Sequence, residues 1–245
     1  MLSAGGEATT AAPGPAPQPD GEDVAGRLCL AITSSTSVVG VAVGRAGAPA
    51  AEAVAHEVAT DRRHAEELTP LVARTLADAG LTLDQIGCFA VDVGPGRFTG
   101  LRVGLATVRT LALVAARPVV ALSSLEILAG AEPDRPLLAV VDARRGEVFQ
   151  QRFGPDGADG APVVGRPEAV APGAAGAGQP VTVGDGADRY PEWYGAGLVP
   201  GREPSAAVMV TLAGRRLALP GHLVAPVYLR DPDVHINVTT RHTPR

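Results

Sequence analysis

Short apolar runs and turn-forming segments alternate at the start of the folded sequence. Leu28 to Ile32 is a continuous apolar run, Ser37 to Val43 is rich in β-branched residues, and a third apolar stretch covers residues 51–58. Polar or glycine-containing turns separate the three. Strands joined by such short turns pair with their sequence neighbours, so the pattern predicts an antiparallel meander.

The pattern then changes to a helical period. One helical face collects apolar residues at 3.6-residue spacing: Leu68, Leu71, Val72, Leu76 and Ala79. Gly80 is a natural stop. Pro70 leaves two starts open, because the helix either begins with Thr69 as its cap and Pro70 at its first position, or begins near Arg62 and is kinked at Pro70.

A strand, a second helix and another strand complete this half. Gly87 to Val93 is apolar, residues 99–116 are helical in composition and end before a proline, and residues 119–122 are apolar again. A meander followed by parallel crossovers predicts a mixed sheet with helices on its faces.

The second half repeats the hairpin in a shorter form. Leu137 to Val141 and Glu147 to Phe153 are expected to pair, and residues 181–183 form a further strand. Residues 154–180 are rich in Gly, Ala and Pro and predict a loop with at most short structure, whereas Ser205 is expected to cap a helix that reaches about Leu217. Two hairpin-led segments indicate an internally duplicated α/β fold.

These patterns divide the chain into four parts. Residues 1–26 are expected to be a disordered tail, because they are rich in Pro and Gly and lack a long apolar run. Residues 27–121 form the first lobe, and residues 122–230 form a second, reduced lobe whose C-terminal helix can return to the first. Residues 231–245 are a polar tail.

Composition narrows the setting of the protein. The chain has 245 residues, of which 46% are hydrophobic but only 3% aromatic, so its core must be built from Ala, Val and Leu. No apolar stretch approaches the roughly 20 residues of a membrane span, and the N-terminus does not resemble a signal peptide. Cys29 and Cys88 each lie in an apolar run and are expected to be small buried residues. We therefore expect a cytoplasmic protein without a membrane contact.

The charged residues exclude several kinds of chemistry. The net charge is −5, and the sequence contains no lysine. A Schiff-base lysine, a P-loop lysine and a Ser-Lys dyad are therefore excluded. The acidic balance argues against nonspecific binding of nucleic acid, so a contact with RNA would have to be local or made through a partner.

The segment Gly94–Gly100 is the most informative loop. It joins a strand to the start of a helix, where unpaired backbone N–H groups can hold an anion. The structural alternative, which we favour, is that small residues let the loop pass tightly over the sheet edge while Phe98 fills the core. The spacing is not that of a dinucleotide-binding loop.

The remaining polar residues form no obvious catalytic set. Asp92 and Asp142 end strands as metal-binding carboxylates do, but the first strand ends in Thr33, so we expect surface or turn-capping acids. The histidines lack an i,i+4 pair that could bind a metal, and His64 is expected to be solvated or at an interface. No cofactor, metal site or catalytic residue is predicted.

Seven segments together resemble the TsaB (YeaZ) family: residues 30–36, 63–68, 94–104, 123–125, 141–149, 184–187 and 226–230. The strings G-P-G-x-F-T-G-x-R-x-G and D-A-R-x-G-E-V are the most specific. The resemblance implies a bacterial protein of the actin-like/Hsp70 ATPase superfamily, with two lobes related to ribonuclease H. It also implies a noncatalytic partner of TsaD, the transferase that places a threonylcarbamoyl group on tRNA. The ATPase TsaE would join through that complex, tRNA would be contacted only indirectly, and a homodimer is possible.

Thr33 and the histidines also bear on this resemblance. The family usually has an Asp at the position of Thr33, and TsaD-like members carry an H-x-x-x-H pair that this chain lacks. Thr33 in place of an acid, together with the absence of lysine, disfavours the alternative function, an autonomous actin-like ATPase or kinase that uses Gly94–Gly100. The missing histidine pair disfavours a metallopeptidase.

The resemblance places the partner interface on the two helices of the first lobe. The expected interface residues are His64, Leu68, Leu71, Val72, Arg102, Gly104, Leu105, Ala106 and Arg109. The family-motif loop comprises Gly94, Pro95, Gly96, Phe98, Thr99 and Gly100.

Overall fold

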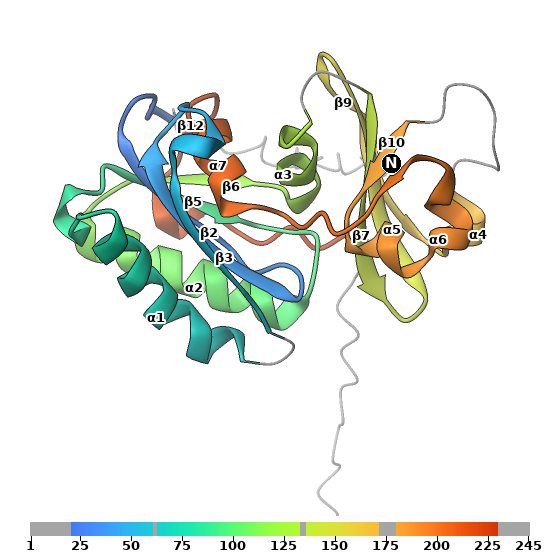
Figure 1. Ribbon diagram of the computed structural model, residues 1–245. Coiled ribbons are helices and arrows are strands. Elements are labelled where there is room, and N and C mark those ends of the chain that lie inside the picture. Colours follow the sequence, from blue (N-terminus) through green and yellow to red (C-terminus); the bar gives the residue numbers. More distant parts are fainter. Residues whose placement is uncertain (1–20, 61–62, 133–135, 172–179, 230–245) are drawn as a thin grey trace, which may run out of the picture.

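Two five-stranded sheets lie beside each other in the computed structural model, which describes residues 21–60, 63–132, 136–171 and 180–229 (Figure 1). The first sheet has the order β4 (Val54–Ala59), β3 (Val38–Arg45), β2 (Leu28–Thr33), β5 (Cys88–Asp92) and β6 (Val119–Leu122). Strands β2, β3 and β4 are antiparallel, while β5 and β6 run parallel to β2. The predicted meander and crossovers are confirmed.

The second sheet repeats this topology. Its order is β9 (Gly157–Gly165), β8 (Glu147–Gly154), β7 (Leu137–Arg144), β10 (Val181–Val183) and β11 (Leu198–Val199). Strands β7, β8 and β9 are antiparallel, and β10 and β11 are parallel to β7. The prediction of an internally duplicated α/β fold with mixed sheets and flanking helices is confirmed.

The expectation of a loop across residues 154–180 was wrong. Strand β9 lies at the sheet edge and is exposed along most of its length, so it carries little hydrophobic pattern. Its conformation comes from backbone pairing with β8. A short helix, α4 (Pro167–Val170), follows it.

The two faces of the first sheet differ in side-chain size. Leu30 and Ile32 point to the face covered by α1 (His64–Asp78) and α2 (Phe98–Ala115). Cys29 and Ala31, at the alternate positions of β2, point to the opposite face of the sheet. There they pack with Cys88 against α7 (Ala206–Ala213). Both cysteines are buried, as predicted.

Helix α1 begins at His64, so the earlier of the two predicted starts is the better one. Pro70 lies inside the helix on its exposed side. The carbonyl four residues earlier belongs to exposed Glu66 and can bond to water, which reduces the cost of the missing N–H. Gly80 ends the helix with a φ of +66°, and the N–H of Leu81 donates to the Leu76 carbonyl (2.9 Å).

The helices that follow the last strand of each sheet tie the two halves together. Helix α3 (Ser124–Gly130) follows β6 and packs Leu125 and Leu128 against the second sheet. Helix α7 follows β11 and returns to the first sheet. Helices α5 (Asp185–Arg189) and α6 (Pro191–Tyr194) cover the second sheet.

Two terminal expectations need correction. Residues 22–24 belong to the fold, because β1 (Glu22–Asp23) pairs with β12 (Leu217–Ala218) and Val24 is fully buried. The last helix ends at Ala213 rather than near Leu217, and Ser205 occupies its N-cap without a side-chain hydrogen bond. The predictions for residues 1–20 and 231–245 lie outside the described residues.

Helix α2 is long and apolar enough, by length and composition alone, to cross a membrane. The sequence expectation had found no such stretch. In the structure, α2 packs Leu101, Leu105 and Val108 into the first half of the molecule. Six of the 18 residues of α2 are buried, so this packing accounts for part of its apolar character.

Candidate partner-binding face

The loop before α2 crosses the end of the first sheet at very short range. A Cβ atom at Gly96 would overlap the Ser35 carbonyl oxygen, and one at Gly100 would overlap the Ser34 carbonyl oxygen. The Arg97 N–H donates to the Ser35 carbonyl at 2.6 Å. These contacts support the tight-crossing interpretation of Gly94–Gly100, because the glycines are needed for close approach.

Asp92 fixes the Gly94–Gly100 loop to the end of the first sheet through side-chain hydrogen bonds. Its Oδ2 accepts hydrogen bonds from the Thr33 hydroxyl (2.8 Å) and the Ser35 hydroxyl (2.5 Å). Its Oδ1 accepts from the Ser124 hydroxyl (2.6 Å) and the Gly94 N–H (2.9 Å). One carboxylate therefore connects the end of β2, the loop before α2 and the start of α3.

Asp92 is a turn-capping acid, the second of the two expected alternatives, and it is buried. Burial raises the pKa of Asp92, while the hydrogen bonds from Ser124, Ser35, Gly94 and Thr33 lower it. The four groups that these hydrogen bonds join to Asp92 are all donors. Among the described residues, no three His, Cys, Asp or Glu side chains are grouped so that they could hold a metal ion.

His64 is buried and not solvated, contrary to expectation. Its Nε2 lies 3.0 Å from the Thr36 carbonyl oxygen and must donate, since a carbonyl only accepts. His64 thus fastens the start of α1 to the same β2–β3 turn that the Gly94–Gly100 loop crosses.

Phe98 does not fill the core. Its side chain is 48% exposed, and its ring lies 5.4 Å from the ring of Tyr228 in the C-terminal segment. The Arg102 guanidinium lies 5.0 Å from the Phe98 ring centre, within the range of a cation–π contact. In the same loop Gly94, Pro95 and Gly100 are buried, while Thr99 is exposed.

Most of the expected interface residues lie in the protein's own core. The buried ones are His64, Leu68, Leu71, Val72, Gly104 and Leu105. Gly104 is packed so closely that a Cβ atom there would overlap the Ser34 hydroxyl oxygen. The helical period correctly identified an apolar face, but that face covers the sheet and not a partner.

The exposed face of α2 contains the residues that a partner could reach. Arg102 and Ala106 lie on it, and so do Leu113 (83% exposed) and Val114 (75% exposed). The sequence analysis missed the last two, although their positions off the buried stripe were readable. Between α1 and α2 runs a groove of about 370 Å³, lined by Thr69, Val72, Ala106, Thr107, Thr110 and Leu111.

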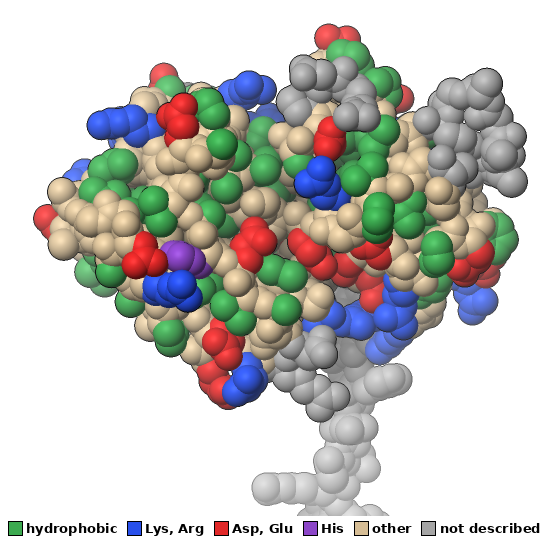
Figure 2. Space-filling model, viewed as in Figure 1, with side chains coloured by type: hydrophobic (Ala, Val, Ile, Leu, Met, Phe, Trp, Pro, Cys, Tyr) green, Lys and Arg blue, Asp and Glu red, His purple; other side chains and the backbone are tan. Residues whose placement is uncertain are grey.

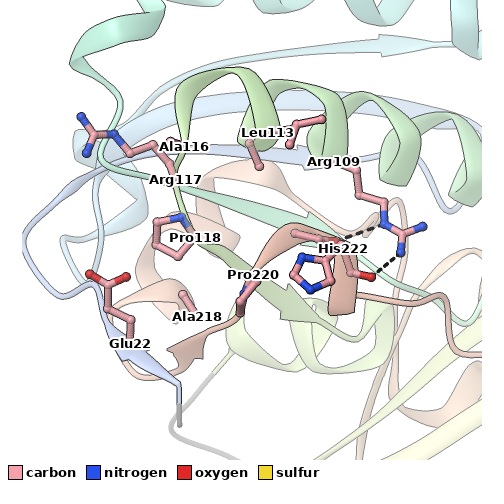
Figure 3. Close-up of a pocket in the computed structure, with 11 residues that line it drawn as sticks. Glu22, Arg109, Leu113, Ala116, Arg117, Pro118, Ala218, Pro220 and His222 are labelled. Atoms are coloured by element: carbon pink, nitrogen blue, oxygen red, sulfur yellow. Dashed lines mark hydrogen bonds between the residues drawn. The ribbon is translucent and has the colours of Figure 1, made fainter. Parts of the chain in front are cut away.

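Arg109, another expected interface residue, is exposed but bonded to its own chain. Its Nε donates to the Gly221 carbonyl (3.1 Å) and its Nη2 to the His222 carbonyl (2.8 Å), as Figure 3 shows. A cavity of about 600 Å³ opens there between the end of α2 and residues 218–222. Arg109 thus fixes the C-terminal segment against α2.

Acidic side chains gather where the two halves meet, with basic side chains below them (Figure 2). Asp142 at the end of β7 lies 3.5 Å from both Arg144 and Arg189. The Asp142 N–H donates to Asp185 Oδ1 at 2.9 Å. Burial raises the pKa of Asp185, and Arg97 and Arg144 oppose that rise.

Comparison with known proteins places the chain in one family. A family model for TsaD, tRNA N6-adenosine threonylcarbamoyltransferase, matches residues 54–165. The sequence is 36% identical to an uncharacterized protein of Mycobacterium tuberculosis over 172 residues, which are 70% of this chain and 77% of that protein.

Some matches cover less of the relative. Identity to an uncharacterized protein of Mycobacterium leprae is 34% over 84% of this chain, but the match spans only 55% of that protein. Identity to the tRNA threonylcarbamoyladenosine biosynthesis protein TsaB of Escherichia coli is 34%, over 51% of this chain and 54% of TsaB.

The comparison of structures covers a whole relative. YeaZ from Pseudomonas aeruginosa superimposes with a TM-score of 0.72 at 30% identity, covering 83% of this chain and 100% of YeaZ. The match therefore includes both sheets and the helices around them. The chain belongs to the TsaB (YeaZ) family.

Proposed function

We propose that this chain is a noncatalytic subunit of the machinery that makes threonylcarbamoyladenosine in tRNA, and that it binds a TsaD-type transferase. The observation that carries the proposal is the exposed face of α2. It combines Phe98, Arg102 and Leu113 in one long helix that is buried on its other side. Aromatic, Arg and large apolar residues are the types that supply binding energy at protein interfaces.

Membership of the TsaB (YeaZ) family supports a role in threonylcarbamoyladenosine biosynthesis. The Escherichia coli relative carries the name of a tRNA threonylcarbamoyladenosine biosynthesis protein. The partner is inferred from the surface of α1 and α2.

The TsaD family model supports the choice of partner. It matches residues 54–165, a range that contains α1 and α2. A TsaD-type subunit would therefore carry counterparts of the same two helices. Two such subunits can pair face to face about a pseudo-twofold axis, with the same surface used on each side. A homodimer of this chain would use that surface too, so it would compete with the transferase.

The polar cluster supports a noncatalytic role. The Asp92 carboxylate is occupied by donors from Thr33, Ser35, Ser124 and Gly94. The alternative, an autonomous ATPase, would need groups that neutralise charge on a transferred phosphate. We propose that TsaE and tRNA meet this chain through the transferase, and that the complex is cytoplasmic.

A charge placed in the α1–α2 groove tests the proposal. Ala106→Glu would bury a carboxylate against the partner, whereas Ala169→Glu adds the same charge to an exposed position of α4. We expect Ala106→Glu to weaken association with the cognate transferase about tenfold or more, since an unpaired buried charge costs several kcal/mol. Ala169→Glu should bind normally. The measurement is calorimetric titration of the purified proteins.

Two results would contradict the proposal. The unaltered chain fails to associate with the transferase, with or without nucleotide, or both variants bind equally well. A normal unfolding curve for Ala106→Glu serves as the control that the fold is intact.

A further inference from the structure

A cavity of about 600 Å³ separates the end of α2 from residues 218–222 (Figure 3). The Arg109 hydrogen bonds described above and the backbone pair between Val119 and Leu219 (both 2.8 Å) hold its two walls together. The walls are mostly apolar and built from small or ring-shaped side chains: Ala112, Leu113, Ala116, Pro118, Ala218 and Pro220. The cavity is therefore a fixed, apolar feature of the fold.

The chain enters the described structure at the rim of this cavity. Glu22, in β1, lines the cavity and pairs with Ala218 of β12 in the antiparallel ladder. Residues 1–20 precede this point and lie outside the described residues, so they must leave from the rim. A segment tethered so close to a site has an effective concentration in the millimolar range, and a weak intrinsic affinity is then enough to hold it there.

The sequence of residues 13–19 suits an apolar cavity of this kind. It reads Pro-Gly-Pro-Ala-Pro-Gln-Pro, in which proline rings alternate with uncharged residues. Proline fixes its own φ and biases the preceding residue to extended backbone, so the run favours polyproline II and loses little entropy on docking. Residues 13–21 in that conformation would extend about 25 Å, whereas the helical wall from Arg109 to Ala116 is only about 10 Å long.

The charges of the segment and of the cavity rim are complementary. Residues 1–20 contain two acids and no basic side chain. Arg117 lies at the rim and is exposed, and within the described part of the chain no acid pairs with it. Glu22 is already paired with Arg27 at 2.6 Å. Asp20, two residues before Glu22, is thus the acid best placed in the sequence to pair with Arg117.

We propose that residues 13–20 dock in the cavity of their own chain as an extended segment. The proline rings pack on the apolar walls, and Asp20 pairs with Arg117. The docked segment covers Leu113, which is otherwise 83% exposed. This inference does not depend on the partner-binding proposal, because the contact forms within one chain.

Paramagnetic broadening in NMR tests the proposal on the full chain. A spin label attached through Ala16→Cys is selective, since the native Cys29 and Cys88 are buried. If the segment is docked at least half of the time, the backbone N–H signals of residues 112–117 and 221–223 should weaken about twofold or more relative to the reduced label. The signals of β9, in the second sheet, should not change.

Two exposed neighbours on α2 provide matched variants. Leu113→Asp and Val114→Asp introduce the same charge, but only Leu113 lines the cavity. Leu113→Asp should reduce the broadening about twofold or more, because the acid faces an apolar segment and repels Asp20, while Val114→Asp should leave it unchanged. Replacing Pro15 and Pro17 by Ser keeps the tether length and should also reduce the broadening.

Any of three results would overturn the proposal. The cavity signals keep their full intensity in the labelled chain, or they weaken equally in the two Asp variants. The third is broadening that appears only when the label and the isotope are on different chains, which would make a second copy the source of the docked segment.

Discussion

At the scale of single residues, the carboxyl groups of Asp92 and Glu203 have different surroundings. Both carboxylate oxygens of Asp92 accept hydrogen bonds from hydroxyl or N–H groups, and these four bonds hold the side chain in place. Glu203 has one oxygen without a partner and faces other acids. Asp92 therefore holds the loop before α2 in place, whereas Glu203 makes the stability of the folded state depend on pH.

Stability should therefore depend on pH through Glu203. Its pKa is about 7 in the folded protein and about 4.5 in the unfolded chain. Between these values the folded state binds the proton more tightly, so the free energy of unfolding falls as pH rises through that window. We expect a loss of about 1–2 kcal/mol, allowing for solvent screening.

Urea unfolding of matched variants measures this loss. The fall in the free energy of unfolding with rising pH should disappear in Glu203→Gln. It should persist in the exposed control Glu168→Gln. A Glu203→Gln protein that keeps the full pH dependence would show that other groups are responsible.

The sequence predicted residue types better than residue environments. It recognised Cys29 and Cys88 as buried, because both lie in continuous apolar runs. It misplaced Phe98 and His64, because a shift of one residue rotates a side chain by about 100° around the helix and so decides whether it faces the sheet or the solvent. That decision depends on the helix's rotation about its axis, which the local sequence does not contain.

At the scale of elements, α2 is defined by how tightly its first turn packs on the β2–β3 turn. Gly100 lies where a Cβ atom would overlap the Ser34 carbonyl oxygen and come within 3.1 Å of the His64 ring. Backbone atoms cannot move aside as a flexible side chain can. The glycine therefore sets the position of the whole helix.

Gly100→Ala should destabilise the protein by about 1–3 kcal/mol, because the helix must shift to make room. Gly154→Ala is the matched control, since a Cβ there meets nothing within 4 Å. Its effect should stay within about 0.5 kcal/mol. Chemical denaturation of both variants checks the prediction. Equal stabilities would show that the first turn of α2 is not closely packed on the β2–β3 turn.

Elements with an apolar period were predictable, and those without one were not. The strands and helices of the first sheet follow their burial patterns closely. Strand β9 was missed because it lies exposed at an edge, and β1 because it is a two-residue pairing with a segment almost two hundred residues away. Long-range backbone pairing leaves no mark on the local sequence.

At the scale of the whole molecule, one topology is used twice, and the two halves exchange their last helices. Helix α3 leaves the first sheet to pack on the second, and α7 does the reverse. The duplication was predictable from the repeated hairpins. The exposed face of α2 was also readable, because Leu113 and Val114 lie off the buried stripe, but the sequence analysis did not assign them to a surface. This face is what remains after the intramolecular packing is complete.

The central claim is that this exposed face of α2 binds a TsaD-type transferase. Hydrogen–deuterium exchange of the chain, alone and mixed with its cognate transferase, tests it most directly. We predict slower exchange in residues 64–78 and 98–115 on mixing, with β9 and α4 unchanged. Slower exchange confined to the second half, with α1 and α2 unaffected, would contradict the account.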